Sequence, residues 1–360
     1  MSGVVLLEHP QHGGQLNFYA QHYGIPKAQW LDLSTGINPN GYPKPSMPET
    51  VLRDLPSDND GLQQAACEYY GSDAVLMVPG SSWAIQNFPV VLLKQNPNIK
   101  QVLLPLVGYS EHQKAWLAQG VMADFYLDTP SAAQLKACDV CVLINPNNPC
   151  SHLLSKEMVL DIAQQLRQHS AWLIVDEAFI DTRPCNSVLM NGEENVIVLR
   201  SLGKFFGLAG LRVGSVVACD SILKHCETLL PPWALSHPAR FIAKLAFQDS
   251  DWIQQTRIRL PHQASKLAEL CEQVFADQLG SAWRILKTDF FVTLLCDSEQ
   301  TILACHHHLC EQGIYTRLLD NHRGIRIGLP KNTHQDWQRL EQGLMCLAHT
   351  LKKETADVGV

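Results

Sequence analysis

Short apolar runs alternate with longer helical patterns from about residue 60 onward, and this alternation constrains the fold more than any other feature of the chain. Apolar strands separated by helices are typical of a parallel sheet that is covered by helices on both faces. We therefore predict an α/β fold whose large domain has a mostly parallel sheet flanked by helices. The candidate strands are residues 75–78, 101–105, a run around 141, 172–176, 195–201 and 213–218.

The pattern changes after residue 230. Pro231 and Pro232 precede a stretch of long helical segments. Strand-like "WRILK" and "FFVTLL", a helix over about 298–312 and a last strand near "GIRIGL" follow. This order predicts a smaller α+β domain over residues 231–360, after a large domain over residues 51–230.

Charge and hydropathy exclude several classes of protein. The chain carries 28 basic and 35 acidic residues, a net charge of -7, and no arginine-rich stripe that would follow a phosphate backbone. We expect no nucleic-acid partner. The start, "MSGVVLLEHPQHGG", does not have the pattern of a secretory signal, and no run reaches the roughly 18 apolar residues of a membrane span. We expect a cytoplasmic protein without a membrane partner.

The 12 cysteines are scattered along the chain, which favours reduced thiols over a disulfide framework. Two patterns could suggest a metal site. "CDVC" (Cys138, Cys141) leads into an apolar strand, which favours a buried structural thiol. "ACHHHLC" (Cys305 to Cys310) has a helical period, so its histidines point in different directions and a solvated helix face is favoured. We expect no metal.

Groups suited to holding a ligand follow nearly every candidate strand. In an open parallel sheet, ligands bind beyond the carboxyl ends of the strands, so these groups should meet. The segments that follow the strands are "PGSS", "LVGYSEH", "NPNNP", "DEAF" and "RSLGK". The sequence therefore predicts a single ligand site at this edge of the sheet.

One part of that site is suited to phosphate. Gly80, Ser81 and Ser82 precede a helical run, and the amino terminus of a helix binds anions. A serine at a helix start is more often a simple cap, which is the alternative interpretation. Ser201 and Arg212 would complete a phosphate cradle.

Three further side chains are suited to a flat, charged ring. Asp176 ends an apolar strand, where a carboxylate needs a partner: either it forms a cap or salt bridge, or it keeps a pyridinium nitrogen protonated. Asn148 can donate to a phenolate oxygen, although the asparagines and prolines of "NPNNP" are also typical of an ordinary loop. Tyr109 can stack on a ring, or be an ordinary core or rim residue.

Lys204 stands among glycines, small residues and apolar side chains. Such surroundings, with Arg212 nearby, should lower the pKa of its amine and make it available for a Schiff base with an aldehyde. A lysine, an aspartate, an aromatic ring, an amide and a phosphate site on successive strand ends together fit pyridoxal 5'-phosphate.

Three motifs carry a family resemblance. With "NPNNP", "VDEAF" and "SLGKFFGLAGLRVG" in this order, the chain resembles over nearly its whole length the fold-type-I pyridoxal-phosphate enzymes of the histidinol-phosphate aminotransferase group. The resemblance implies that Lys204 carries the cofactor, Asp176 holds its pyridine nitrogen, Asn148 its phenolic oxygen, and Tyr109 stacks on its ring. It implies catalytic roles for Lys204, Asp176 and Tyr109. The implied phosphate ligands are Gly80, Ser81, Ser82, Ser201 and Arg212.

Within this group the chain is most similar to the threonine-phosphate decarboxylases of cobalamin biosynthesis. The motifs are "HGG", "LDLSTGINPNGYP", "LPSDNDGLQQAACEYYG" and "GYSEHQKAW". The resemblance implies a homodimer that converts L-threonine O-3-phosphate to (R)-1-amino-2-propanol O-2-phosphate. It also implies that residues 1–50 cover the active site. The implied contacts to the substrate phosphate are His12, Gly13 and Asn38.

Two arginines near the carboxyl terminus are further substrate candidates. Arg326 in "GIRIGLP" presents a guanidinium fork suited to a carboxylate, and Arg317 in "IYTRLL" is suited to a phosphate or a carboxylate. Three residues depart from the family pattern. Phe179 replaces a usual tyrosine, Leu55 replaces a tyrosine that reaches the neighbouring subunit, and Gly203 replaces a Ser or Thr.

Two other functions stay open at this point. A histidinol-phosphate aminotransferase would use the same cofactor, but it needs a 2-oxo acid acceptor. A non-catalytic binding protein that kept the fold is the alternative outside enzymes. Lys204 and Asp176 argue against it, since both are present.

Overall fold

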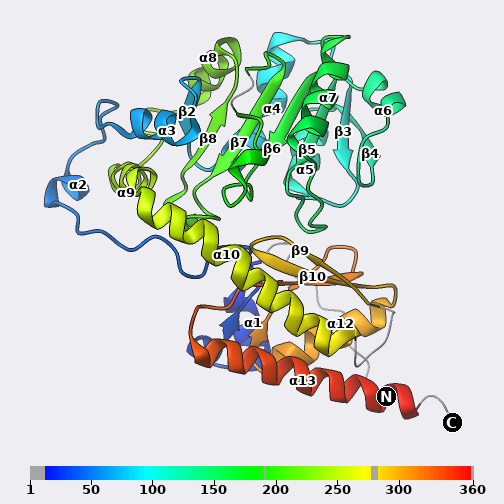
Figure 1. Ribbon diagram of the computed structural model, residues 1–360. Coiled ribbons are helices and arrows are strands. Elements are labelled where there is room, and N and C mark those ends of the chain that lie inside the picture. The colour runs from blue at the N-terminus through cyan, green and yellow to red at the C-terminus, as the bar shows by residue number, and fades with distance from the viewer. Residues whose placement is uncertain (1–12, 190–191, 277–282, 358–360) are drawn as a thin grey trace. The chain divides into compact units, whose positions relative to one another are not determined.

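The computed structural model describes residues 13–189, 192–276 and 283–357 (Figure 1). The chain divides into two compact units, and each is described here by itself. The large unit is residues 41–259, and the small unit combines residues 1–40 with 260–360. The chain passes from one unit to the other after residues 40 and 259. The sequence places the domain bounds at residues 50 and 230, and those bounds stay a prediction.

The large unit is built on a seven-stranded sheet with the order β2-β8-β7-β6-β5-β3-β4. β8 runs antiparallel to both of its neighbours, β7 and β2, and the remaining pairs are parallel. All strands except β8 therefore share one direction, and their carboxyl ends lie at one edge of the sheet. The strands are β2 (Val75–Val78), β3 (Gln101–Pro105), β4 (Met122–Tyr126), β5 (Val140–Ile144), β6 (Trp172–Asp176), β7 (Val196–Ser201) and β8 (Gly214–Val217).

Helices cover both faces of this sheet (Figure 1). The connections through α4 and α5 lead toward β4, and those through α6 and α7 lead the opposite way, so right-handed crossovers put the two pairs on opposite faces. α4, α5 and α8 share one apolar core with the sheet. The helices are α2 (Glu49–Arg53), α3 (Leu62–Tyr70), α4 (Ser81–Gln95), α5 (Glu111–Ala118), α6 (Ala132–Ala137), α7 (Lys156–Arg167), α8 (Asp220–Leu229), α9 (His237–Gln248) and α10 (Ser250–Cys271), which continues into the small unit.

The small unit combines an antiparallel sheet of order β12-β13-β10-β9 with a short parallel pair, β1 and β11. It is an α+β arrangement, as the sequence predicts. Its strands are β1 (Leu31–Asp32), β9 (Trp283–Lys287), β10 (Phe291–Cys296), β11 (Ile314–Tyr315), β12 (Arg317–Leu318) and β13 (Gly324–Gly328). Its helices, besides the end of α10, are α1 (Leu16–Tyr23), α12 (Glu299–Glu311) and α13 (His334–Asp357).

The histidine run on α12 is not the solvated helix face that the sequence predicts. Cys305, His306 and Cys310 are buried, because α12 packs against the strands of the small unit, while His307 is exposed. Among the residues that the structure describes, no group of three His, Cys, Asp or Glu is arranged to hold a metal ion. Within the same residues, no helix has the length and apolar character that a membrane span requires.

Candidate active site

The sheet register brings two predicted phosphate-binding segments together. Gly214, the first residue of β8, lies opposite Val78 of β2 on one side and Ser201 of β7 on the other. A Cβ at Gly214 would come within 2.5 Å of the Ser81 nitrogen, so only glycine lets the chain cross here. The start of α4 and the end of β7 therefore lie on either side of Gly214.

Helix α4 begins without a side-chain cap, unlike α7, whose Ser155 hydroxyl accepts from the N–H of Met158. Its N-cap residue is Gly80, in the left-handed region at φ 80°, so Ser81 and Ser82 lie inside the first turn. The interpretation of these serines as caps is therefore wrong. Uncapped N–H groups and two hydroxyls at a helix amino terminus form a site suited to an anion.

Arg212 lies beside this helix start. Its Nη2 is 3.5 Å from the Ser82 hydroxyl oxygen, and a Cβ at Gly80 would come within 2.8 Å of the same Nη2. Arg212 has φ 55°, and its Nη1 donates to the carbonyl of Ala209. A guanidinium, a helix amino terminus and the Ser82 hydroxyl thus lie close together, and their role as a phosphate cradle stays a prediction.

Asp176 ends β6 and is buried, at 4% exposure. Its Oδ2 lies 3.1 Å from Nε2 of His112, which is also buried, and its Oδ1 accepts from the N–H of Ala178 at 3.1 Å. A buried carboxylate so placed is compensated by its partners and can hold a protonated ring nitrogen of a ligand. The turn bond and the contact with His112 match the interpretation of Asp176 as a cap or salt-bridge partner, and its role toward a pyridine nitrogen stays a prediction.

Lys204 lies in the turn after β7 and is half-buried, followed by the fully buried Phe205 and Phe206. Its Nζ is 5.3 Å from the ring centroid of Phe179, the residue that stands in place of the usual tyrosine. A Cβ at Gly203 would meet the Ala209 Cα at 3.1 Å. Glycine therefore fits the position before Lys204, because a side chain there would crowd Ala209.

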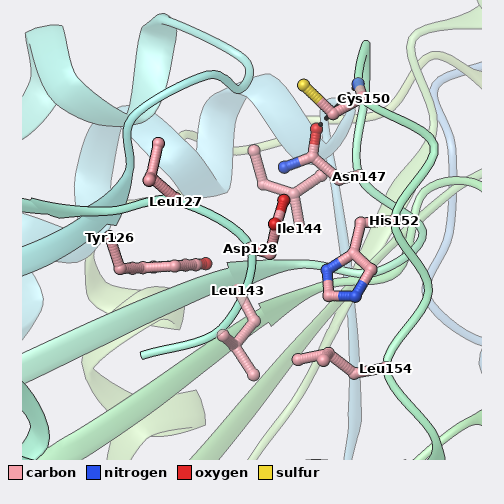
Figure 2. Close-up of a pocket in the computed structure, with 9 residues that line it drawn as sticks. All are labelled: Tyr126, Leu127, Asp128, Leu143, Ile144, Asn147, Cys150, His152 and Leu154. Atoms are coloured by element: carbon pink, nitrogen blue, oxygen red, sulfur yellow. Dashed lines mark hydrogen bonds between the residues drawn. The ribbon is translucent and has the colours of Figure 1, made fainter. Parts of the chain in front are cut away.

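The asparagine loop, residues 145–149, follows β5 and is stabilised by hydrogen bonds of its own side chains. Asn145 exchanges two hydrogen bonds with the backbone of Leu154, and Asn147 Oδ1 accepts from the N–H of Cys150. Figure 2 shows Asn147 and Cys150 joined at the rim of a small pocket that His152 also lines. Asn148 is half-buried, whereas the other two asparagines are buried.

Tyr109 lies between β3 and α5 and is half-buried. Its ring centroid is 6.4 Å from that of His112, one helical turn further on, in an edge arrangement. Asn147 Nδ2 donates to the carbonyl of Val107 at 3.2 Å, so the asparagine loop also fixes the segment that leads to Tyr109. Tyr109, His112 and the loop thus form one connected group.

The small unit brings its two candidate arginines together. Arg317 of β12 and Arg326 of β13 are directly opposite in the antiparallel register, so both side chains lie on one face of the sheet. Arg326 is buried, and its Nη2 donates to the carbonyl of Ser34 at 2.7 Å. Burial, together with the charge of Arg317, lowers the pKa of Arg326 to about 9. Arg317 also pairs with Asp320, its Nη2 lying 3.4 Å from Oδ1, and the two guanidinium groups are together suited to an anionic ligand.

The other substrate candidates lie near the start of the chain. A Cβ at Gly13 would come within 2.3 Å of the carbonyl oxygen of Ser34. Asn38 is buried, and its Oδ1 accepts from the N–H of Asn40, so its amide shapes a turn. His12 lies outside the described residues.

The residues present in the large unit fit pyridoxal phosphate. An uncapped helix start with Arg212 suits the phosphate, the Asp176–His112 pair suits a protonated pyridine nitrogen, and the half-buried amine of Lys204 suits an aldehyde. Together these groups define the class of a pyridoxal-phosphate enzyme with an open α/β sheet.

Comparison with known proteins agrees with that class. Residues 32–343 match the family "Aminotransferase class I and II", and the chain belongs to this family. It is 35% identical over 336 residues to a threonine-phosphate decarboxylase of Pseudomonas aeruginosa, covering 93% of this chain and 97% of the relative. It is 38% identical over 243 residues to a threonine-phosphate decarboxylase of Sinorhizobium sp, covering 66% and 71%.

Solved structures give the same fold. A histidinol-phosphate aminotransferase from Sinorhizobium meliloti in complex with pyridoxal-5'-phosphate has a TM-score of 0.78 at 18% identity and covers 98% of this chain and 100% of its own. An L-threonine-O-3-phosphate decarboxylase from Porphyromonas gingivalis has a TM-score of 0.72 at 17% identity, covering 88% and 99%. The fold is the fold-type-I pyridoxal-phosphate transferase fold, and the family depends on this cofactor.

His112 is the site residue that the sequence interpretation does not single out. The segment "GYSEHQKAW" could have indicated His112. His112 stands three positions after Tyr109 at the start of a helix, and residues three apart lie on the same side of a helix. Its contact with Asp176 joins residues 64 positions apart, and strand order alone does not predict it.

Proposed function

We propose that this protein is a pyridoxal-phosphate decarboxylase that converts L-threonine O-3-phosphate to (R)-1-amino-2-propanol O-2-phosphate and carbon dioxide. The observation that carries the substrate class is the opposed pair of Arg317 and Arg326. A substrate with both a phosphate and a carboxylate supplies anions to two neighbouring guanidinium groups. The two threonine-phosphate decarboxylase relatives support this choice.

The large unit supplies the groups that bind the cofactor. The start of α4, Ser201 and Arg212 would hold the phosphate, and Asp176, oriented by His112, would keep the ring nitrogen protonated. Asn148 would donate to the phenolic oxygen, and Tyr109 would stack on the ring. When bound, pyridoxal phosphate supplies an electron sink for the bond broken at the substrate Cα.

Lys204 performs the proton transfer. With the cofactor and substrate bound, the Lys204 amine would hold a proton and return it to the substrate Cα from which carbon dioxide has left. Its half-buried position beside Phe179 limits access of water to that proton. Arg317 and Arg326 bind the acidic groups of the substrate, with His12, Gly13 and Asn38 as further contacts.

Histidinol-phosphate aminotransferase is the second candidate, because it would use the same cofactor and a substrate that carries both an amine and a phosphate. The two reactions differ in what they consume. An aminotransferase leaves the cofactor in its amine form after the first half-reaction and needs a 2-oxo acid to restore the aldehyde, whereas a decarboxylase needs no second substrate. A non-catalytic binding protein has no use for Lys204 and the buried Asp176–His112 pair.

The test is carbon dioxide release from L-threonine O-3-phosphate by cofactor-loaded protein without any 2-oxo acid. The proposal expects release by the wild type and none by Lys204→Ala. No release, combined with glutamate-dependent conversion of imidazole-acetol phosphate, would assign the protein to the aminotransferases instead.

Three further features belong to the proposal. The protein acts in the cytoplasm as a homodimer, and its product enters the side chain of cobalamin. Leu55 is 66% exposed in the isolated chain, and it replaces the tyrosine that relatives extend toward a neighbouring subunit. Sedimentation of the holoenzyme tests the dimer, and rescue of a cobalamin-dependent growth defect tests the pathway.

A further inference from the structure

Residues 31–35 of the small unit form a strip between two strands, and Leu31, Leu33 and Ser34 in this strip are buried. The N–H of Leu33 donates to the carbonyl of Tyr315 in β11, and the N–H of Gly328 in β13 donates to the carbonyl of Leu33, both at 2.7 Å. Ser34, the next residue, is fully buried. This strip is therefore held in register with β13, the strand that carries Arg326.

The hydroxyl of Ser34 has a defined direction. It donates to Oδ1 of Asp32 at 2.7 Å, and the backbone N–H of Ser34 donates to the same oxygen at 3.0 Å. An ionised carboxylate only accepts hydrogen bonds, so the hydroxyl proton faces Asp32. The lone pairs of the Ser34 oxygen are then available to the N–H of Gly14, which donates to it at 2.8 Å.

The carbonyl of Ser34 makes a second link. It accepts from Nη2 of Arg326 at 2.7 Å. The same carbonyl oxygen lies where a Cβ at Gly13 would come within 2.3 Å, so the chain passes directly over it. Ser34 thus contacts the start of the chain through its hydroxyl and Arg326 through its backbone.

We propose that Ser34 is a positioning residue that couples the placement of Gly13 and Gly14 to the orientation of the Arg326 guanidinium. This inference rests on the proposed function, in which Arg326 binds an acidic group of the substrate and Gly13 is a further contact. Ser34 itself does not touch the substrate. Asp32 takes part by fixing the direction of the Ser34 hydroxyl.

The coupling predicts a selective defect. Ser34→Ala removes the acceptor for the Gly14 N–H and leaves the backbone carbonyl in place. It also removes the donor to Asp32. The KM for L-threonine O-3-phosphate should rise about tenfold, because the part-buried hydrogen bond that holds Gly14 is lost, while kcat should stay within about twofold. Ser34→Cys, which keeps the side-chain volume with a weak acceptor, should change KM in the same direction.

The experiment measures KM and kcat for the holoenzyme together with hydrogen exchange at the Gly14 amide. Ser298→Ala is the matched control, because Ser298 also accepts a backbone N–H, that of Thr301, at the start of α12. We expect faster Gly14 exchange and a raised KM in both Ser34 variants, with neither change in Ser298→Ala. Unchanged Gly14 exchange and KM in the Ser34 variants, or an equal rise of KM in Ser298→Ala, would overturn the inference.

The two proposals fail separately. If the wild-type protein releases no carbon dioxide from L-threonine O-3-phosphate, the proposed function is wrong. If the wild type is active and Ser34→Cys matches it in KM and in Gly14 exchange, the function stands and the role of Ser34 is wrong.

Discussion

The imidazole Nε2 of His112 lies 3.1 Å from Oδ2 of Asp176, and both side chains are buried. Asp176 ends a central strand, and His112 lies in the first turn of α5, one turn beyond Tyr109. The pair therefore links the residue proposed to hold the ring nitrogen with the residue proposed to stack on the ring.

Replacing His112 tests this link. His112→Leu removes the partner of a buried carboxylate, which costs about 1.5–3 kcal/mol for a bond to a charged group. We expect pyridoxal phosphate to bind roughly 10- to 100-fold more weakly, measured by titration of apoprotein. His306→Leu is the control, since His306 is also buried and its Nε2 lies 3.1 Å from the carbonyl of Thr316. Equal cofactor affinities for the two variants would contradict the link.

The glycine before α4 allows a second prediction. A Cβ at Gly80 would lie 2.8 Å from Nη2 of Arg212, so Gly80→Ala must displace the guanidinium from the phosphate cradle. We expect about a tenfold loss of cofactor affinity, or about 1.4 kcal/mol. Gly120 has a similar φ of +74°, with no atom within 4 Å of an added Cβ. Gly120→Ala should lower stability by about 1 kcal/mol through backbone strain and leave cofactor affinity unchanged. A cofactor affinity of Gly80→Ala equal to that of wild type would count against the cradle.

An acid-dependent ion pair holds the turn before α3. Burial alone would raise the pKa of Asp60, but the bonds from Arg240 at 2.6 and 2.9 Å and from the N–H of Leu62 lower it below its ordinary value of 3.8. A carboxylate with a lowered pKa stabilises the fold above its ordinary pKa. That stabilisation is lost as the pH falls through the lowered value.

Asp60→Asn should therefore reduce the free energy of unfolding by about 1 kcal/mol near pH 7. The difference from wild type should shrink below pH 4, where Asp60 of the wild type takes up its proton. Urea unfolding across this range measures both. Asp58→Asn is the control. Oδ1 of Asp58 lies 3.3 Å from Nη1 of Arg240, but the Asp58 side chain is fully exposed, so its replacement should have little effect on the free energy of unfolding. A pH-independent difference for Asp60→Asn would refute the ion pair.

Much of the large unit is predictable from sequence because its strands are buried on both faces. The apolar runs at residues 75–78, 101–105 and 172–176 match β2, β3 and β6 in full. The sequence misses β4, since only Tyr126 of its five residues is buried and an edge strand needs no apolar run. The two-residue strands β1, β11 and β12 are too short to leave a pattern.

The candidate site is predictable where one residue type fits one task, and less so where the task depends on a tertiary contact. Lys204, Asp176 and Arg212 stand out by chemistry and by their places after strands. His112 and Ser34 do not, because their roles depend on Asp176 and on the Gly14 and Arg326 contacts, which are distant in the sequence.

The most direct test of the central claim is the number of carbon dioxide molecules released per active site from L-threonine O-3-phosphate, with all 2-oxo acids removed. A decarboxylase regenerates its cofactor in each cycle, so we predict many molecules of carbon dioxide per Lys204 and an unchanged visible absorption band of the cofactor afterwards. No carbon dioxide, with conversion of one cofactor per site to its amine form, would contradict the decarboxylase and identify an aminotransferase.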